Sequence, residues 1–343
     1  MSLMTVRRFA AKAIRSRLER EAAMQLPGLL RSLGAMFTRP ARVREYNFEP
    51  PHLALFDSAR MTAPCDQESP RRGLRVVPRG TAIAPFVRRR SEHLSFSPAE
   101  MPALAIDAGN QATVSIMGTD ADKYEVRFCA QAGAANEGDA RRSLEEITLE
   151  RTSQWLKVRA PQDSRERPAQ ARLDVQAARH RAVRVNGSYS YTELFGIDAV
   201  VRLSTTHARM KLIEVAGDVH ATAHVGIIDF AGDRGRIELH ADGEIGEINP
   251  KFTNTLFDGT LDAEAEVAIR VLLPPACESS FEAVVERPDL FVCRADIAPR
   301  LRRQDRRGAV AFSYGHDDPL LRLISHGAMV IDTADHLTSP RLQ

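Results

Sequence analysis

Histidines and carboxylates in the middle of this sequence are the residue types best suited to metal chemistry. The interval from His220 to Glu238 equals the interval from His224 to Asp242. Imidazole and carboxylate groups are common metal ligands, but residues four apart along a β-strand are separated by about 13 Å, too far for both imidazoles to share one ion. We therefore expect a polar ladder of His and acidic side chains across neighbouring strands, with neither a metal ion nor a cofactor.

A second group of reactive residue types lies close together near the C-terminus. The segment AFSYGHDDPLL contains Ser313, His316, Asp317 and Asp318. A nucleophilic serine on a strand-turn-helix elbow needs glycine on both sides, whereas Ala311 occupies the first of these positions. Triad geometry depends on proximity in space and not in sequence, so we predict a polar turn, no catalytic residue and no enzyme. A carbohydrate-active or hydrolytic β-helix enzyme using Glu238, Asp242 or Asp317 is the alternative.

Arginine clusters before residue 91 are the candidate macromolecule-binding residues. They could lie along phosphates or along an acidic protein surface and become ordered on contact, and a solvated linker is the alternative. No RNA-binding module with interleaved aromatic residues accompanies them, so RNA is the weaker of the two expected partners. The clusters contain Arg71, Arg72, Arg75, Arg79, Arg88, Arg89 and Arg90.

The charge of the 343-residue chain is unevenly divided, although its formal net charge is only +2. Residues 1–90 carry 18 basic and 7 acidic side chains, a difference of +11, and residues 91–343 carry 29 basic and 38 acidic side chains, a difference of −9. A basic N-terminal region therefore precedes an acidic body. No apolar run approaches the ~18–20 residues of a membrane-spanning helix. The four cysteines form no CxxC pair, which favours free thiols in a reducing compartment.

The basic region divides into two predicted segments. Residues 1–38 begin with an amphipathic, Arg-rich and acid-poor stretch, which is typical of a mitochondrial transit peptide; a bacterial protein of the cytoplasm or cell envelope is the alternative. Residues 39–98 are rich in Pro and Arg and predict a basic extended arm. A folded domain is expected over residues 99–340.

This domain contains a repeat with a period of about 18 residues, within the range of solenoid proteins. Alternate residues of a strand point to one face, so each unit would supply an inward strand triplet, a turn and a second short strand. The predicted columns are Val201, Val219 and Ile237; Leu203, Ala221 and Leu239; Thr205, Ala223 and Ala241; Leu212, Phe230 and Ile248; and Gly217 with Gly235. The register resumes after an excess of six residues in PKFTNTLFDG.

The repeat predicts a mainly β fold, a β-solenoid in which each unit packs on its neighbours. A β-sandwich of antiparallel hairpins is the alternative. A short amphipathic helix is expected in DARRSLEEITLER, and residues 161–180 are expected to form a polar loop or short helix. Because open sheet edges invite pairing, residues 40–95 or 300–343 are candidates to cover the terminal units.

The repeat also resembles a known family. Val219, Ala221, Gly226 and Ile227, and more loosely Leu239, Gly243 and Ile245, match the pattern of the bacterial putative-adhesin family, β-solenoid domains of unknown function. The resemblance covers about residues 100–300. It departs at Ala208-Arg209, where the family has a glycine, and in the secretory or membrane signal frequent in that family. Some eukaryotic relatives look mitochondrial, and the resemblance implies no catalytic residue.

The expected function is that of a non-enzymatic scaffold subunit of a larger assembly. Protein subunits are the expected partners, with a contact to RNA through the basic arm as a further expectation and no integral membrane segment. A mitochondrial ribosome-like particle or respiratory complex fits the N-terminal segment. A bacterial adhesin-like, cell-associated protein is the alternative.

Overall fold

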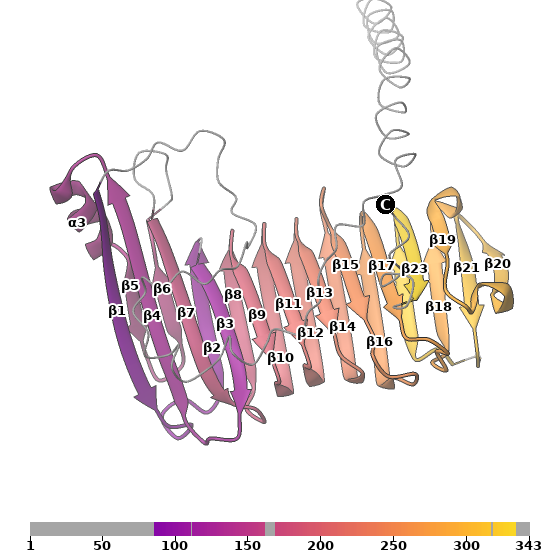
Figure 1. The fold of residues 1–343 in the computed structure, drawn as a ribbon, viewed down its shortest axis with the longest axis horizontal. Coiled ribbons are helices and arrows are strands. Elements are labelled where there is room, and N and C mark those ends of the chain that lie inside the picture. Colours follow the sequence, from indigo (N-terminus) through magenta and orange to yellow (C-terminus); the bar gives the residue numbers. More distant parts are fainter. Residues whose placement is uncertain (1–85, 111, 162–168, 317, 334–343) are drawn as a thin grey trace, which may run out of the picture. The chain divides into compact units, whose positions relative to one another are not determined.

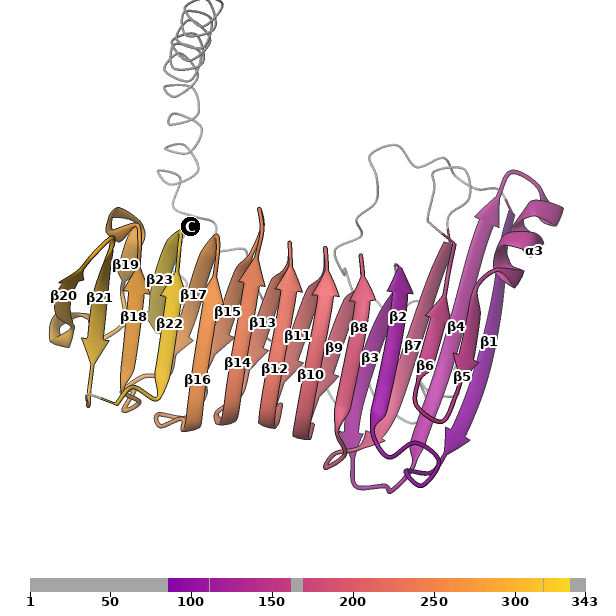
Figure 2. The ribbon, with the colours of Figure 1, turned by 180° about the vertical axis from the view of Figure 1, so that it is seen from behind.

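The structure is a computed structural model that describes residues 86–110, 112–161, 169–316 and 318–333. These residues form a mainly β fold with two large, mostly parallel sheets of 11 and 12 strands (Figures 1 and 2). The side chains of both sheets meet in one hydrophobic core. This arrangement is consistent with a β-helix-like fold.

The first sheet, here called sheet A, contains the following strands in spatial order. They are β1 (Phe86–Phe96), β4 (Tyr124–Ala134), β7 (Ala169–Ala178), β3 (Ala112–Thr119), β9 (Tyr191–Phe195), β11 (Arg209–Ile213), β13 (Ile227–Ala231), β15 (Glu247–Lys251), β17 (Ala268–Leu273), β23 (Ala328–Thr333) and β19 (Phe291–Cys293).

The second sheet, here called sheet B, contains the remaining described strands. They are β20 (Arg302–Arg306), β21 (Ala309–Tyr314), β18 (Phe281–Val285), β22 (Leu321–Ser325), β16 (Asp258–Ala265), β14 (Arg234–Asp242), β12 (Ala216–His224), β10 (Asp198–Thr206), β8 (Val183–Ser188), β2 (Leu104–Asn110), β6 (Leu156–Arg159) and β5 (Thr148–Arg151). The described helices are α3 (Glu137–Glu145) and the 3-10 turns η2 (Pro288–Leu290) and η3 (Ala298–Arg300).

The register predicted for the repeat is confirmed in sheet B. Val201 of β10 pairs with Val219 of β12, which pairs with Ile237 of β14, and all three side chains are fully buried. These pairs are parallel, and each unit contributes one strand to sheet B and the next to sheet A. Parallel pairing between equivalent strands of successive units excludes antiparallel hairpins for this part of the chain.

One predicted column in sheet A is wrong. Leu212 pairs with Phe230 as expected, but Phe230 pairs with Pro250, and Ile248 pairs with Ile228. Between β14 and β15 the turn has four residues, whereas the equivalent turn between β12 and β13 has two. The expected excess of six residues is therefore divided, with two in this turn and four in the segment 252–257 that precedes β16.

The prediction of a loop or short helix over residues 161–180 is also wrong for its described part. β7 lies inside sheet A, parallel to β3 and antiparallel to β4. Its inward positions are Ala169, Ala171, Leu173, Val175 and Ala177, and polar side chains alternate with them. Three of these five inward residues are alanine, which is only weakly hydrophobic. The alternation of apolar and polar residues that would predict a strand is therefore faint in this sequence.

The folded region begins nearer the N-terminus than the predicted start at residue 99. Phe86–Phe96 pairs antiparallel with β4 over its whole length, so the sheet includes residues that the sequence assigned to the arm.

The expected short helix is confirmed as α3, whose N-cap Asn136 accepts a hydrogen bond from the backbone N–H of Asp139 at 2.8 Å. Cys129 on β4 is disulfide-bonded, contrary to the expectation of free thiols, whereas Cys277 and Cys293 are free.

Gly217 lies where the backbones of two neighbouring units come close together. Gly217 has φ +93°, and a Cβ placed there would overlap the carbonyl oxygen of Ala199 in the neighbouring unit. Gly308 also has a left-handed φ of +79°, but a Cβ there would meet nothing within 4 Å. A side chain at Gly308 would thus cause backbone strain alone, whereas a side chain at Gly217 would cause both strain and steric overlap.

We predict that Gly217→Ala lowers the free energy of unfolding by about 3 kcal/mol, since overlap adds to the strain of a left-handed residue. Gly308→Ala, which introduces only the strain, should cost about 1 kcal/mol. Chemical denaturation of both variants beside the wild type measures the difference. Equal losses in the two variants would show that the units are not in close contact at Gly217.

Candidate functional site

A row of polar side chains crosses the outer face of sheet B, the face opposite the hydrophobic core. We call it the polar row, and its members are neighbours in the register of eight adjacent strands. From β5 to β16 they are Glu150, Lys157, Asp107, Asn186, Ser204, Thr222, His240 and Glu264.

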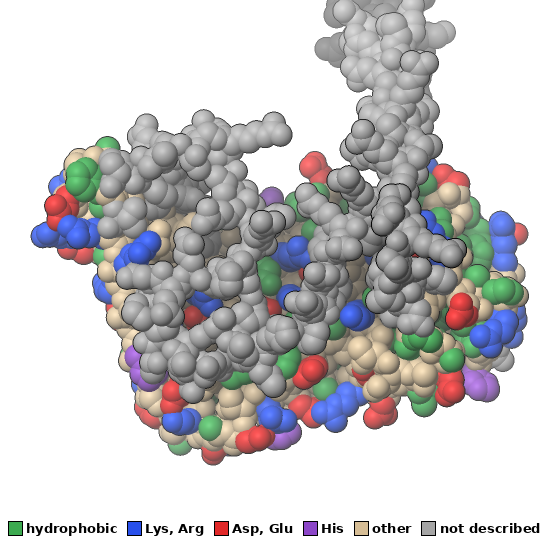
Figure 3. Space-filling view, in the orientation of Figure 1, with side chains coloured by type: hydrophobic (Ala, Val, Ile, Leu, Met, Phe, Trp, Pro, Cys, Tyr) green, Lys and Arg blue, Asp and Glu red, His purple; other side chains and the backbone are tan. Residues whose placement is uncertain are grey.

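The alternation of each strand places these side chains outward. In β12, Val219, Ala221 and Ala223 are buried, and His220, Thr222 and His224 between them are partly or fully exposed. Sheet spacing separates neighbouring strands by about 4.8 Å, so the seven intervals of the polar row extend over roughly 34 Å. Figure 3 looks at the molecule from the side of sheet A and shows Lys and Arg side chains interspersed with Asp and Glu side chains among its coloured residues.

The predicted ladder of histidines and carboxylates beside the polar row is confirmed. His220 Nδ1 lies 3.0 Å from Glu238 Oε2, and His224 Nδ1 lies 2.8 Å from Asp242 Oδ2. The hydrogen bond from His220 is the main cause that lowers the pKa of Glu238, and Arg236 lowers it further. Each of these two imidazoles thus contacts a different carboxylate, and Asp242 Oδ2 also lies 3.8 Å from His240 Nε2. Among the described residues, no group of three or more His, Cys, Asp or Glu side chains is placed to hold a metal ion.

His326, just after β22, is the most strongly paired histidine of this face. Its Nε2 lies 3.0 Å from Glu264 Oε1 and its Nδ1 lies 3.0 Å from Glu286 Oε1. The hydrogen bonds that His326 donates to Glu264 and then to Glu286 raise the pKa of His326, and Glu266 adds a smaller attraction to the imidazolium. This cluster could not be predicted from the repeat, because β22 lies between β16 and β18 in sheet B although it follows both in the sequence.

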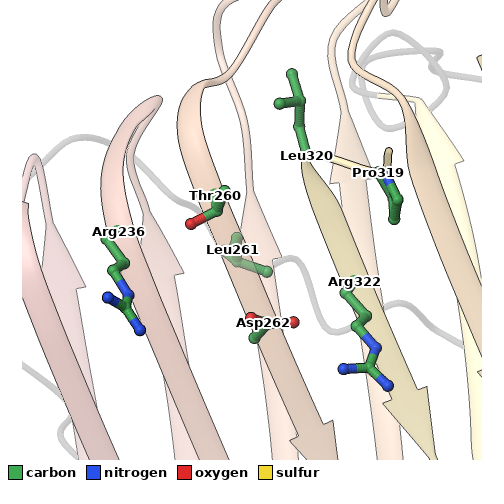
Figure 4. A pocket seen from close by; sticks show the side chains of 7 residues that line it. All are labelled: Arg236, Thr260, Leu261, Asp262, Pro319, Leu320 and Arg322. Carbon is green, nitrogen blue, oxygen red and sulfur yellow. The ribbon is translucent and has the colours of Figure 1, made fainter. Parts of the chain in front are cut away.

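A hollow of about 490 Å³ lies on the same sheet at the start of β16 and β22 (Figure 4). The side chains of Arg236 and Arg322 stand on either side of Asp262. Arg236 Nη2 lies 3.1 Å from Glu238 Oε1. Carboxylates therefore stand beside or between both guanidinium groups, and the hollow has no concentrated positive charge that would select an anion.

The residues that suggested a serine hydrolase do not form a triad in the described structure. Ser313 lies on β21, where it pairs with Glu282 of β18 and Arg302 of β20. His316 is exposed in the following turn, and the carbonyl oxygen of Asp318 accepts a hydrogen bond from Ser280 Oγ at 3.0 Å. Asp317 lies outside the described residues.

Only three of the seven arginines proposed to bind a macromolecule fall in the described part of the chain. Arg88, Arg89 and Arg90 lie on β1, where Arg88 pairs with Glu137 of α3 and Arg89 Nε donates to Gln131 Oε1 at 3.2 Å. Arg90 Nε lies 3.0 Å from Glu92 Oε1. Outside the described residues are Arg71, Arg72, Arg75 and Arg79, together with the whole of the predicted 1–38 segment and the arm up to residue 85.

Comparison with known proteins adds little to this picture. No protein-family model matches the chain, and no curated protein matches it. A crystal structure of "a putative cell adhesion protein from Clostridium sporogenes" is similar with a TM-score of 0.33 and 11% identity, over 72% of this chain and 99% of that chain. At this TM-score the similarity supports no conclusion about function, and the adhesin family stays a prediction. None of the described helices is long and apolar enough to span a membrane.

The His326 cluster predicts a pH-dependent contribution to stability. Because the folded-state pKa is raised above the unfolded value near 6.5, the contribution is complete below that value and is lost as pH rises through the folded pKa. We expect His326→Gln to lower the free energy of unfolding at about pH 5 and to lower it less at about pH 8. Urea denaturation at both pH values, with His316→Gln as the control, measures this; a loss independent of pH would contradict it.

Proposed function

We propose that this chain is a non-enzymatic β-solenoid scaffold that binds a macromolecular partner on the outer face of sheet B and so serves as a subunit of a larger assembly. The polar row is the observation that carries the proposal. It presents hydroxyl, amide, imidazole and carboxylate groups in register over eight strands.

The parallel pairing supports the solenoid. Strands from β8 to β17 alternate between the two sheets, and the pairs keep a constant spacing in the sequence from β10 to β14. The inward triplet of each of these units lies between the triplets of the units beside it. Because each unit is held by the units on both sides of it, the outward side chains keep a regular spacing, which is the property a scaffold needs.

The charge pattern of the face supports a partner that is bound through many polar contacts. Arg202 Nη2 lies 2.6 Å from Asp218 Oδ2, and Lys157 Nζ lies 3.1 Å from Asp107 Oδ2. Arg159 and Arg236 are also paired with carboxylates. Because these cations are paired, the charge of the face is partly neutralised, which favours another folded protein over a nucleic acid. Non-obligate protein interfaces are commonly of this polar kind.

The compartment of the assembly and a contact of the basic arm with RNA are predictions that concern residues outside the described part of the chain. A mitochondrial complex and a bacterial envelope assembly are both compatible with a neutralised, polar docking face. The proposal above holds for either location.

Capture from an extract of the native cell, with the full chain as bait, tests the proposal. We expect the wild type to retain a defined set of proteins and the Ser204→Arg/Thr222→Arg double variant to retain at least tenfold less, because two long cations then stand in the middle of the polar row. Both side chains point away from the core, so the change in stability should stay within about 0.5 kcal/mol per site.

Gln304→Arg on β20 is the matched control, since it adds an arginine at an exposed position away from the polar row. It should capture the same proteins as the wild type. Equal capture by the double variant, or a wild-type chain that is recovered alone, would contradict the proposal.

A further inference from the structure

A second hollow lies at the β5–β6 end of the outer face of sheet B, at the start of the polar row. Its volume is about 310 Å³. The residues around it are Asp107, Glu150, Thr152, Trp155, Lys157 and Asn186. Trp155 is the single tryptophan of the chain. An aromatic ring, a neutral amide and ion-paired groups therefore surround one small space.

The backbone of Trp155 is held by its own turn, and its indole ring is contacted by Arg184. The backbone N–H of Thr152 donates to the carbonyl oxygen of Trp155 at 2.9 Å, and Thr152 Oγ1 accepts from the backbone N–H of Trp155 at 2.9 Å. The guanidinium of Arg184 lies 5.1 Å from the centroid of the indole ring. The held backbone and the contact with Arg184 restrict the side chain of Trp155, so less conformational entropy is lost when a ligand stacks on the ring.

The charged groups of the hollow already have partners. Lys157 Nζ lies 3.1 Å from Asp107 Oδ2, and Arg159 Nη2 lies 3.0 Å from Glu150 Oε2. A phosphate or sulfate group would have to displace a carboxylate to reach either cation. Arg184 contacts the indole ring but is not among the residues that line the hollow. The hollow is thus better suited to a neutral molecule that both donates and accepts hydrogen bonds than to an anion.

Two neutral polar groups at the hollow are available to hydrogen-bond such a molecule. Neither the Asn186 amide nor the Trp155 indole N–H makes a hydrogen bond to another residue that the structure describes. The amide can donate and accept, and the indole can donate. An aromatic ring beside amide and carboxylate groups is suited to a sugar, whose C–H face packs on the ring while its hydroxyls bond to the polar side chains.

We propose that this hollow is a binding site for a neutral saccharide, with Trp155 as the stacking platform and Asn186 and Asp107 as hydrogen-bonding groups. From Asn186 the polar row continues to Ser204 and Thr222 in register, at intervals of about 4.8 Å. An oligosaccharide can follow this row beyond the hollow, so it should bind more tightly than a monosaccharide. The proposal does not depend on the scaffold function.

Because Trp155 is the only tryptophan, intrinsic tryptophan fluorescence reports on this hollow alone. The full chain is titrated separately with three hexasaccharides, of β-1,4-linked glucose, α-1,4-linked glucose and β-1,4-linked N-acetylglucosamine. We expect a saturable change in emission with at least one of them, and a higher Kd for the matching monosaccharide. No change with any of the three would overturn the proposal.

Two variants locate the site by calorimetric titration with the responding sugar. Asn186→Ala should raise the Kd about tenfold, which corresponds to the loss of hydrogen bonding of about 1.4 kcal/mol. Asn254→Ala, in an exposed segment before β16, is the matched control and should bind like the wild type. An equal loss in both variants, or no loss in either, would overturn the assignment.

A sulfated oligosaccharide that saturates the fluorescence change more tightly than all three neutral sugars would also overturn the proposal. Loss of protein capture by the Ser204→Arg/Thr222→Arg variant is measured separately. The saccharide site and the scaffold function can therefore fail independently of each other.

Discussion

The backbone of each central unit depends on units distant in the sequence for its hydrogen bonds. No strand from β8 to β17 pairs with the strand that directly follows it; each pairs with the strands on either side of it in its sheet, which for β16 and β17 include β22 and β23. The turns obey the same rule, since the N–H groups of Tyr189 and His207 donate to the carbonyls of Thr206 and His224 in the next unit, both at 2.7 Å. Tyr189 and His207 have left-handed φ angles of 48° and 51°. Such angles are unfavourable for residues with a side chain, so the bonds between units must offset this strain.

This dependence explains which parts of the fold could be predicted from the sequence. Each connection between consecutive strands from β10 to β14 has two residues, so Val201, Val219 and Ile237 reveal the period directly. The segments 243–246 and 252–257 are longer than the two-residue turns of the central units. The total excess of six residues could be counted from the sequence, but its division between the two segments could not, which hid the pairing of Ile248 with Ile228.

The candidate sites were only partly predictable for a related reason. His220 and Glu238 belong to adjacent units of constant spacing, and their contact follows from the period. The saccharide hollow instead joins Trp155 to Asn186 through β6, β2 and β8, which are consecutive in sheet B but not in the sequence. The period of the repeat contains no signal for that arrangement. Nor does it indicate that β7, with its small inward alanines, lies inside sheet A.

The pairing of parallel units also determines how such a gene can change in length. A deletion of one residue inside a central strand would turn the rest of that strand over, exposing its apolar side chains and burying its polar ones. Loss or duplication of a whole unit would leave every remaining strand in phase, and the antiparallel pairs β1–β4, β5–β6 and β20–β21 at the sheet ends would be unaffected. Insertions and deletions among homologues should therefore come as complete units, or fall in turns such as 243–246 and 252–257.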